Sequence, residues 1–442
     1  MAFLVGGCVR DLLLGIEPKD FDVATDALPE QVKRLFRNCR LVGRRFRLAH
    51  VFFGREIIEV ATFRATSAPS QGDEPLPPAD PEDGEAAELD DDPALDEPEP
   101  VAAEVAGEQN PERMFDATGR ILRDNVYGTI DEDVWRRDFT ANALYYNIAD
   151  FSIWDYVNGV ADIGTRTLRL IGDPETRFRE DPVRMLRAAR FEAKLGFRLD
   201  PATAAPLAQL QELLAGVPPA RLFDETLKLF LTGHGARSFE VLRRRGLLAA
   251  LLPSVDAYYA SHPGSLVEKL LLQGLKNTDA RVLADKPVTP TFLFALLLYG
   301  PIAGLIEATP PERWHEMATI LDACDRAVRE AQTHIAIPKR FSLGVREMFA
   351  LQPRLEHPRG RRALRLLEHP RFRAAYDLLL LRAQFGLAPQ EMAQWWTGLQ
   401  EAPPAEREKM ADGLTGGTRP AGGARRRGGR RRRRRSGAPS SA

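Results

Sequence analysis

Residues 4–22, LVGGCVRDLLLGIEPKDFD, set the expected architecture of the N-terminal part of the chain. A short apolar run ends at Val5 and meets the pair Gly6-Gly7, and an apolar-periodic segment begins at Val9. This order predicts a strand, a tight turn and the start of a helix. A second strand then follows a break marked by glycine and proline.

The glycine turn has the composition of a phosphate-binding element. Glycine allows backbone N–H groups to approach a ligand closely, and a helix N-terminus favours negative charge. Arg10 follows within a few residues and can supply a charge-assisted donor. We therefore interpret Gly6, Gly7 and Arg10 as a phosphate cradle.

Two carboxylates, Asp20 and Asp22, lie on the predicted second strand. Alternate residues of a strand face the same side, so both carboxylates should point together. Mg²⁺ prefers oxygen ligands and usually keeps substrate phosphates in its shell, which favours a magnesium site here. The alternative is a solvated acidic strand end, because Asp-x-Asp is a common pattern.

Length and cysteine content limit the class of protein. A chain of 442 residues is long enough for two to four structural units. Its three cysteines, Cys8, Cys39 and Cys324, are scattered without zinc-ligand spacing. They argue against a disulfide framework and favour a reducing compartment, so we expect a cytoplasmic protein. We also expect no membrane span and no signal peptide.

The net charge of −1 conceals two oppositely charged segments. Fifteen acidic residues and no Lys or Arg lie between Asp73 and Glu108. This composition predicts a disordered acidic insertion over residues 65–112. The C-terminal segment is rich in Gly and Arg, which predicts a disordered tail that binds RNA through its phosphates. Its expected RNA-binding residues are Arg425, Arg426, Arg427, Arg430, Arg431, Arg432, Arg433, Arg434 and Arg435.

The remaining pattern separates strands from helices. A helix is predicted at 29–36 and a pair of strands at 41–64, with Glu59 among apolar neighbours in the second strand. Glu59 either faces solvent or forms a third carboxylate beside the Asp pair. Another strand is predicted at 144–153, and only helices follow residue 172. We therefore predict an α/β head followed by an all-helical remainder.

Asp181 and Arg184 begin one of these helices. Their spacing of three lets the side chains converge, so together they could accept from and donate to a base edge. Such a pair admits adenine and cytosine and rejects guanine and uracil, but it does not separate adenine from cytosine. The alternative is an ordinary helix cap at Asp181-Pro182 followed by solvated arginines.

Four motifs in this order resemble those of the class II nucleotidyltransferases, which comprise bacterial poly(A) polymerases and tRNA CCA-adding enzymes. The motifs are GGCVRD at 6–11, DFD at 20–22, RRDFTANA at 136–143 and EDPVR at 180–184. Further segments look like the poly(A) polymerase branch, namely LVGRRFRLAHV at 41–51, EVATFR at 59–64, IAIPKRF at 335–341 and the arginine-rich end. The resemblance covers about residues 2 to 400.

The resemblance implies a polymerase-beta-like head followed by a helical neck, body and leg. The expected parts are the head at 1–64 and 113–170, the insertion at 65–112, the neck at 171–235, body and leg at 236–405, and the tail at 406–442. The sequence departs from the family in two ways. It starts almost at the first strand instead of with a helix, and its acidic insertion replaces a shorter connection.

The resemblance also implies a role for each site residue. Asp20 and Asp22 would hold two Mg²⁺ ions, with Asp138 as a further catalytic residue and Glu59 as the third acidic residue of the sheet. The other residues would bind ATP: Gly6, Gly7, Arg10 and Arg137 at the triphosphate, Asp181 and Arg184 at the base, and Arg187 close to the nucleotide.

The expected function is template-independent transfer of AMP from ATP to RNA 3′ ends, with release of pyrophosphate. One alternative is a tRNA CCA-adding enzyme, which would use the same residues. The other, of a different class, is a non-catalytic RNA-binding protein on the same scaffold. The expected partners are RNA 3′ ends, ATP and RNA-decay proteins, and the expected state is a monomer.

Overall fold

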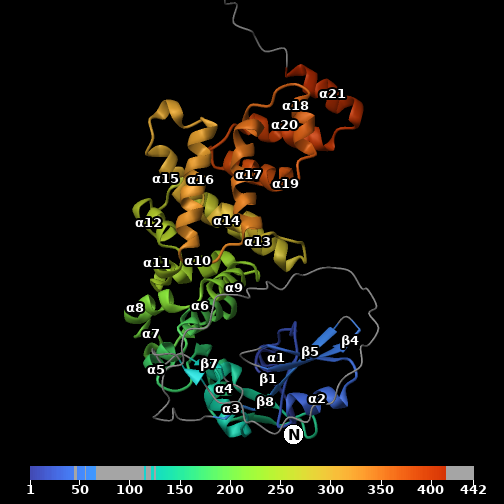
Figure 1. Cartoon of the computed structure of the whole chain (residues 1–442), viewed down its shortest axis with the longest axis vertical. Helices are drawn as coiled ribbons and strands as arrows, with labels where there is room; N and C mark the ends of the chain where they lie inside the picture. The colour runs from blue at the N-terminus through green and yellow to red at the C-terminus, as the bar shows by residue number, and fades with distance from the viewer. Residues whose placement is uncertain (44–46, 55, 66–113, 116–120, 124–125, 415–442) are drawn as a thin grey trace, which may run out of the picture. The chain divides into compact units, whose positions relative to one another are not determined.

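The structure is a computed structural model that describes residues 1–43, 47–54, 56–65, 114–115, 121–123 and 126–414. Contacts divide the chain into two compact units, Met1–Phe349 and Ala350–Ala442. The first unit holds a mixed sheet and many helices, and the described residues of the second are helical (Figure 1). Each unit is described by itself.

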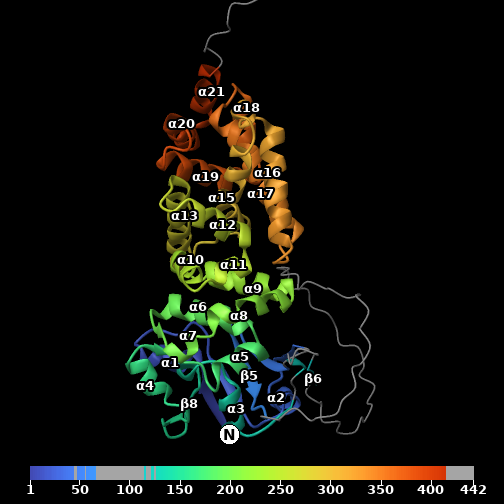
Figure 2. The same cartoon turned by 90° about the vertical axis from the view of Figure 1, so that its left-hand side faces the viewer.

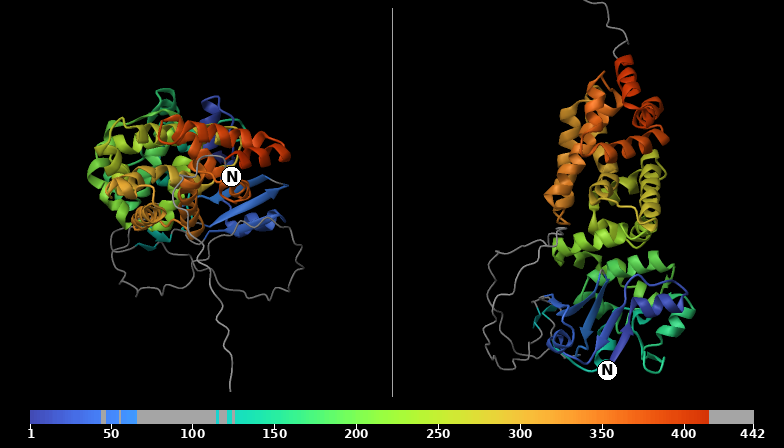
Figure 3. Two further views of the ribbon diagram at one scale, coloured as in Figure 1. Left: turned by 90° about the horizontal axis from the view of Figure 1, so that it is seen from above. Right: turned by 90° about the vertical axis from the view of Figure 1, so that its right-hand side faces the viewer.

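Seven strands of the first unit form one sheet in the order β3-β4-β5-β2-β1-β8-β9 (Figures 1 and 3). They are β1 (Ala2–Val5), β2 (Asp22–Thr25), β3 (Cys39–Val42), β4 (Leu48–Phe53), β5 (Glu56–Thr62), β8 (Leu144–Tyr146) and β9 (Ile153–Asp155). Neighbouring strands are antiparallel except β2 and β5, which run parallel. Because β1 lies between β2 and β8, the sheet brings the two halves of the predicted head together.

Three strand predictions differ from the structure. The expectation that only helices follow residue 172 is wrong at Arg198–Leu199, a short strand that pairs with Thr167–Leu168. The region 41–64 forms three strands instead of a pair, since β3 already begins at Cys39. The predicted strand at 144–153 is a hairpin of β8 and β9. The side chains of Asn147 and Asp150 accept backbone N–H groups two residues further on, and this local bonding stabilises a turn in place of extended backbone.

Helices pack on the sheet and position its loops. The first is α1 (Gly7–Leu13), followed by α2 (Pro29–Leu35), α3 (Ile130–Arg136), the 3₁₀ helix η1 (Thr140–Asn142) and α4 (Gly159–Gly164). A capping box between Thr129 and Glu132 starts α3. Val134 of α3 is buried in a cluster with Phe3 and Tyr145 of the sheet. This packing fixes the residues that follow α3.

The first unit also contains two small sheets and a long series of helices. The small sheets pair β6 (Met114–Phe115) with β7 (Ile121–Arg123) and β10 (Thr167–Leu168) with β11 (Arg198–Leu199). The helices are α5 (Pro174–Glu180), α6 (Val183–Leu195), α7 (Pro201–Ala204), α8 (Leu207–Leu210), η2 (Gln211–Gly216), α9 (Pro219–Phe230), α10 (Gly235–Arg244), α11 (Leu247–Leu251), α12 (Pro253–Ser261), α13 (Leu266–Leu283), α14 (Pro290–Leu297), α15 (Tyr299–Glu307), η3 (Pro311–Arg313), α16 (Met317–Gln332) and the first part of α17 (Lys339–Glu356).

Helix α6 is the central helix next to the head. Its buried residues include Val183, Met185 and Leu186, and it packs against both α9 and α10 (Figure 2). Gly196 ends it in the left-handed conformation with φ +70°, as is common after a helix. The helix also carries Arg184 and Arg187, which pair with Glu180 and Asp138.

The second unit packs around one tryptophan. Its helices after α17 are α18 (Arg362–Leu367), α19 (Phe372–Gln384), α20 (Gln390–Glu401) and α21 (Pro404–Gly413). Trp396 is fully buried beside Phe372, and its indole N–H donates to the Leu355 carbonyl at 2.8 Å. The buried indole therefore has a hydrogen-bond partner, as a core Trp requires.

Within the described residues, no single helix is long and apolar enough to cross a membrane. The bent pair α14 and α15 passes that test jointly, by length and composition only.

Candidate active site

Two carboxylates of the predicted set face each other on neighbouring strands. Asp22 is the first residue of β2 and pairs in register with Glu59 of β5. Asp20 lies just before β2 and not on it, which differs from the predicted Asp-x-Asp strand. Burial raises the pKa of Asp22, and the nearby charges of Glu59 and Asp20 raise it further against the opposing effect of Arg137. The three carboxylates therefore repel one another at one edge of the sheet.

The glycine turn lies beside these carboxylates. Gly6 has φ +80°, a conformation that L side chains rarely adopt, and Gly7 begins α1. A Cβ at Gly6 would lie 3.7 Å from Nη1 of Arg137. The turn therefore has space for a close approach, with a guanidinium at its side.

Arg137 is fixed in place by two groups of the head. Its Nε and Nη2 donate to the Asp133 carboxylate at 3.1 and 2.9 Å, and Nε also donates to the Tyr145 hydroxyl at 2.8 Å. Burial alone would lower the pKa of Arg137, but Asp133 outweighs it and the pKa is raised. Arg137 is thus a permanent cation next to the turn, in keeping with the predicted triphosphate contact.

Arg10 is turned inward. It is only 2% exposed and donates to Asp11 and, at 2.5 Å, to Oδ1 of Asn142. The sequence predicts that Arg10 contacts the triphosphate directly. In this structure the guanidinium is occupied by protein groups, so such a contact requires that it change partners.

Asp138 and Arg187 form an ion pair between the head and α6. The guanidinium donates twice to Oδ2 of Asp138, at 2.8 and 2.5 Å, and Asn142 donates to Oδ1 at 3.3 Å. Burial alone would raise the pKa of Asp138, but Arg187 and these hydrogen bonds hold it at about 2. Asp138 is therefore ionised at any ordinary pH, and its negative charge is already paired.

The two residues of the predicted base-reading pair each form hydrogen bonds with other groups. Both carboxylate oxygens of Asp181 accept from Arg221 of α9 at 2.8 Å. Arg184 instead donates to Glu180 at 3.0 Å and to the backbone carbonyl of Arg177 at 2.8 Å. The spacing of three does place the residues near each other, but each side chain has a stronger partner on another turn or helix.

The donor set suits a hard divalent cation. In the described part of the chain, no three Asp, Glu, His or Cys side chains already stand close enough to hold a metal ion. Asp20 and Asp22 are nevertheless oxygen donors, and their repulsion with Glu59 is relieved by a cation. Because Mg²⁺ usually takes one or two carboxylates plus substrate phosphates, these residues fit it as a nucleotide-bound ion.

Sequence reasoning gave no role to three residues that organise the site. Asn142 links Arg10 to Asp138, Arg221 holds Asp181, and Asp133 holds Arg137. Asn142 lies within the RRDFTANA motif at 136–143, so the sequence does indicate that it belongs to the site. The role of Arg221 carries no local signal in the sequence, because its partner lies 40 residues away.

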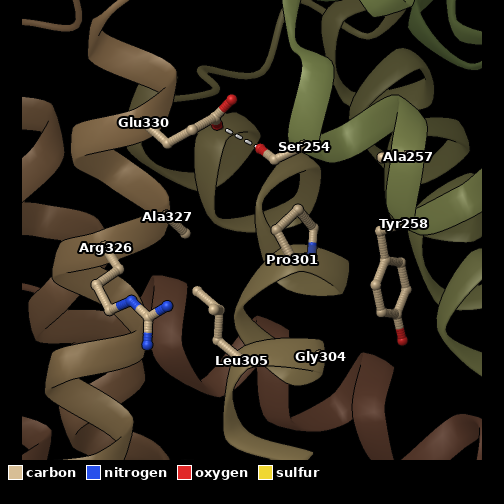
Figure 4. Close-up of a pocket in the computed structure, with 9 residues that line it drawn as sticks. All are labelled: Ser254, Ala257, Tyr258, Pro301, Gly304, Leu305, Arg326, Ala327 and Glu330. Carbon is tan, nitrogen blue, oxygen red and sulfur yellow. Dashed lines mark hydrogen bonds between the residues drawn. The ribbon is translucent and has the colours of Figure 1, made fainter. Parts of the chain in front are cut away.

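A separate pocket of about 440 Å³ lies between α12, α15 and α16 (Figure 4). Tyr258, Pro301 and Leu305 line it, and the Ser254 hydroxyl donates a hydrogen bond to Glu330 at one side. None of the predicted site residues lines this pocket. The predicted arginine tail, Arg425 to Arg435, and nearly all of the acidic insertion lie outside the described residues.

The mixed sheet, the carboxylates at its edge and the helical remainder define a nucleotidyltransferase head joined to a helical body. A family model described as "Poly A polymerase head domain" matches residues 2–169. Two others, "Probable RNA and SrmB- binding site of polymerase A" and "Polymerase A arginine-rich C-terminus", match residues 196–259 and 312–436. The chain belongs to the poly(A) polymerase family and is a nucleotidyltransferase enzyme. The predicted family, fold class and enzyme class are therefore confirmed.

Individual relatives separate the two branches of the superfamily. Poly(A) polymerase I of Salmonella typhi is 44% identical over 93% of this chain and 82% of its own length. The CCA-adding enzyme of Lactobacillus helveticus (strain DPC 4571) is 32% identical over 54% of this chain and 48% of its own. Among solved structures, "Structure of tRNA-processing enzyme complex 3" matches with a TM-score of 0.56 and 20% identity over 93% of each chain, which supports the fold alone.

Proposed function

We propose that this chain adds AMP from ATP to RNA 3′ ends without a template and releases pyrophosphate. The observation that carries the proposal is the register of Asp22 with Glu59, which gathers mutually repelling carboxylates beside the Gly6 turn. The 44% identity to a poly(A) polymerase over most of both chains supports the choice of reaction.

The residues divide the chemistry between them. The RNA 3′ oxygen attacks the α-phosphorus of ATP, a bond to that phosphorus forms, and the bond to the β-phosphate oxygen breaks. Asp20 and Asp22 would hold Mg²⁺, which when bound lowers the pKa of the 3′-hydroxyl and offsets charge on the pyrophosphate. Arg137 would bind the triphosphate at the glycine turn. The protein contributes mainly positioning and electrostatic stabilisation, because the nucleophile belongs to the RNA.

Base selection would depend on the segment around Asp181 and Arg184. In the structure, the Arg221 guanidinium donates to both oxygens of the Asp181 carboxylate at 2.8 Å and fixes its position. Arg184, held by Glu180, would have to supply the donor to the base. Arg187 of α6 is held by Asp138 of the head, and in this position it would be close to the nucleotide.

The test uses purified protein with Mg²⁺, labelled ATP or CTP, and two acceptors. One acceptor is a generic RNA with a free 3′ end, and the other is a tRNA that lacks its terminal CCA. A long ladder from ATP on the generic RNA, with little use of CTP, is the expected result. Addition of two C and one A to the tRNA only would identify a CCA-adding enzyme instead. RNA binding without any metal-dependent transfer would leave the non-catalytic alternative.

Other expectations stay predictions. The two Mg²⁺ ions, the monomeric state, the cytoplasmic location, the RNA-decay partners and the domain boundaries belong to this group.

A further inference from the structure

Carboxylates hold most arginines of helices α5 to α10. The pairs are Arg177 and Arg184 with Glu180, Arg179 with Glu175, Arg187 with Asp138, Arg221 with Asp181, Arg243 with Glu268, and Arg244 and Arg245 with Glu192. A few cations in or near these helices differ, because no carboxylate in the described part of the chain forms a close ion pair with them. Over the described residues, Lys19, Arg190 and Arg237 have no ion pair, and Lys194 has only a distant one with Asp11 at 3.9 Å.

These cations come from three elements that meet at one place. Arg190 and Lys194 are four apart on α6 and so share a face of that helix. Arg237 of α10 reaches back to the end of α6, since a Cβ at Gly196 would lie 3.2 Å from its Nη2. Helices α6 and α10 pack together along this region (Figure 2). Lys19 lies in the connection between α1 and β2 and adds the third element.

The charges act on one another. Burial lowers the pKa of the Lys194 ammonium, and Arg10, Arg190 and Lys19 lower it further against the effect of Asp11. Burial also lowers the pKa of His234, where Asp279 acts in the opposite sense and Lys194, Arg237 and Lys19 add to the lowering. Burial is the largest cause of both lowered pKa values, and the neighbouring cations add to it.

The carboxylates nearby have other partners. Asp11 accepts from Nε and Nη2 of Arg10 at 2.8 and 2.6 Å. Asp279 accepts the backbone N–H groups of Gly235 and Ala236 at the start of α10, at 2.5 and 3.0 Å. Burial lowers the pKa of Arg190 and Glu225 opposes that effect, so the half-buried cation has a carboxylate acting on it. Within the described residues, Lys19 and Arg237 form no ion pair, and an external anion would relieve the repulsion among these exposed cations.

The layout favours a chain of phosphates over a single anion. Lys19, Lys194 and Arg237 are exposed and belong to three different elements, so each can contact a separate phosphate of one strand. Lys19 directly precedes Asp20, which places one end of the row next to the predicted catalytic carboxylates. A groove of separate cations along a path is typical of proteins that bind a single-stranded nucleic acid backbone.

We propose that Lys19, Arg190, Lys194 and Arg237 bind successive phosphodiester groups of the RNA close to its 3′ end. The proposal rests on the proposed function, because it uses the RNA substrate of that reaction. It goes further by naming the residues that guide the strand to Asp20 and Asp22. Arg190 is the inner member and the other three are the outer members of this phosphate row.

The test measures binding of a labelled oligoadenylate RNA to the full chain, without ATP, over a series of salt concentrations. The variants are Lys19→Ala, Lys194→Gln, Arg237→Ala and the double variant Lys194→Gln/Arg237→Ala. Each lost phosphate contact should reduce the slope of log K against log salt by about 0.7, or about fivefold in affinity at 0.1 M salt. Arg329→Ala, which removes an exposed cation of α16, is the matched control and should change neither.

Steady-state kinetics distinguish binding of the RNA phosphates from binding of the ATP triphosphate. The expected result is a raised KM for RNA in each row variant, with the KM for ATP at saturating RNA unchanged. A raised KM for ATP with normal RNA binding would mean that the row binds the triphosphate, and the proposal would be wrong. Unchanged RNA affinity and salt slope in folded variants, checked by thermal unfolding, would also overturn it. Because binding is measured without turnover, failure of the wild-type chain to transfer AMP would contradict the proposed function and not this proposal.

Discussion

Asp22 lies where catalysis and stability make opposite demands. Its carboxylate is half-buried opposite Glu59, and like charges facing each other across strands are destabilising. We expect Asp22→Asn to raise the free energy of unfolding by about 0.2–1 kcal/mol. The same variant should reduce the rate of AMP transfer by about 10²–10³-fold. The Mg²⁺ ion would lose a carboxylate ligand, and the charge that develops in the reaction would be less well stabilised. Thermal unfolding and a primer-extension assay measure the two effects. Near-normal incorporation would contradict the assignment of Asp22 to the metal site. We expect Asp20→Ala to lose AMP transfer as well.

Arg187 determines the protonation of Asp138. In the folded chain the pKa of Asp138 is about 2, below the ordinary value near 3.9, so the pair stabilises fully above about pH 4. This stabilisation is lost as the pH falls towards about 2. In Arg187→Met the carboxyl stays buried without its partner, and its pKa should rise above the ordinary value. We expect a loss of about 3–5 kcal/mol of unfolding free energy at pH 7.

The pH dependence of this stability loss shows whether it comes from an unpaired Asp138 charge or only from lost packing of the Arg187 side chain. The difference between wild type and Arg187→Met should shrink as the pH falls from 7 towards 3, because protonation removes the unpaired charge of the variant. Denaturant unfolding at several pH values measures it. Arg179→Met is the control, since that exposed arginine pairs only with exposed Glu175 and should change stability by less than about 1 kcal/mol. A difference that stays constant with pH would show that Asp138 does not depend on Arg187.

At the scale of elements, the contact of α4 with η1 supports the loop that carries Asp138. Gly159 begins α4, and a Cβ there would lie less than 3.0 Å from the backbone carbonyl of Thr140. Thr140 follows Asp138 by two residues, so a shift of η1 moves the carboxylate. We expect Gly159→Ala to destabilise by about 1–3 kcal/mol and to reduce activity as well.

The same helix offers a matched control. Gly164 ends α4, and a Cβ there meets nothing within 4 Å. Gly164→Ala should therefore be neutral or slightly stabilising, by a few tenths to about 1 kcal/mol. Thermal unfolding and single-nucleotide incorporation of both variants give the comparison. Equal behaviour of the two would mean that the α4–η1 contact does not support the site.

At the scale of the whole molecule, the arginine-rich tail should contribute affinity without chemistry. Deleting residues 415–442 removes the nine clustered arginines. We expect weaker RNA binding and a salt slope reduced by up to about 6, since each phosphate contact to a single strand contributes about 0.7. Turnover for one added nucleotide at saturating RNA should be retained. Replacing the nine arginines by lysines should keep most of the slope, and unchanged affinity of the deletion across salt would contradict the prediction.

The first strand, the glycine turn and the helix after it were predictable from sequence because their signals are local. An apolar run, a pair of glycines and a helical period occupy about a dozen consecutive residues, and backbone preferences act over that distance. The extra strand β3 and the β8–β9 hairpin were missed for a related reason. The turn between β8 and β9 depends on local side-chain hydrogen bonds at Asn147 and Asp150 that hydrophobic periodicity does not report.

The sequence by itself determined the family, the α/β head with a helical remainder, and the acidic and basic residue types of the site. Only the tertiary structure decided their partners. Asp22 meets Glu59 because β2 and β5 are parallel neighbours, and Asp181 pairs with Arg221 of α9. Asn142 joins Arg10 to Asp138 across 132 residues of chain. Residue type and spacing fix the chemistry a side chain can offer. Which partner a side chain contacts depends on strand order and helix packing, because these bring together residues that are far apart in the chain.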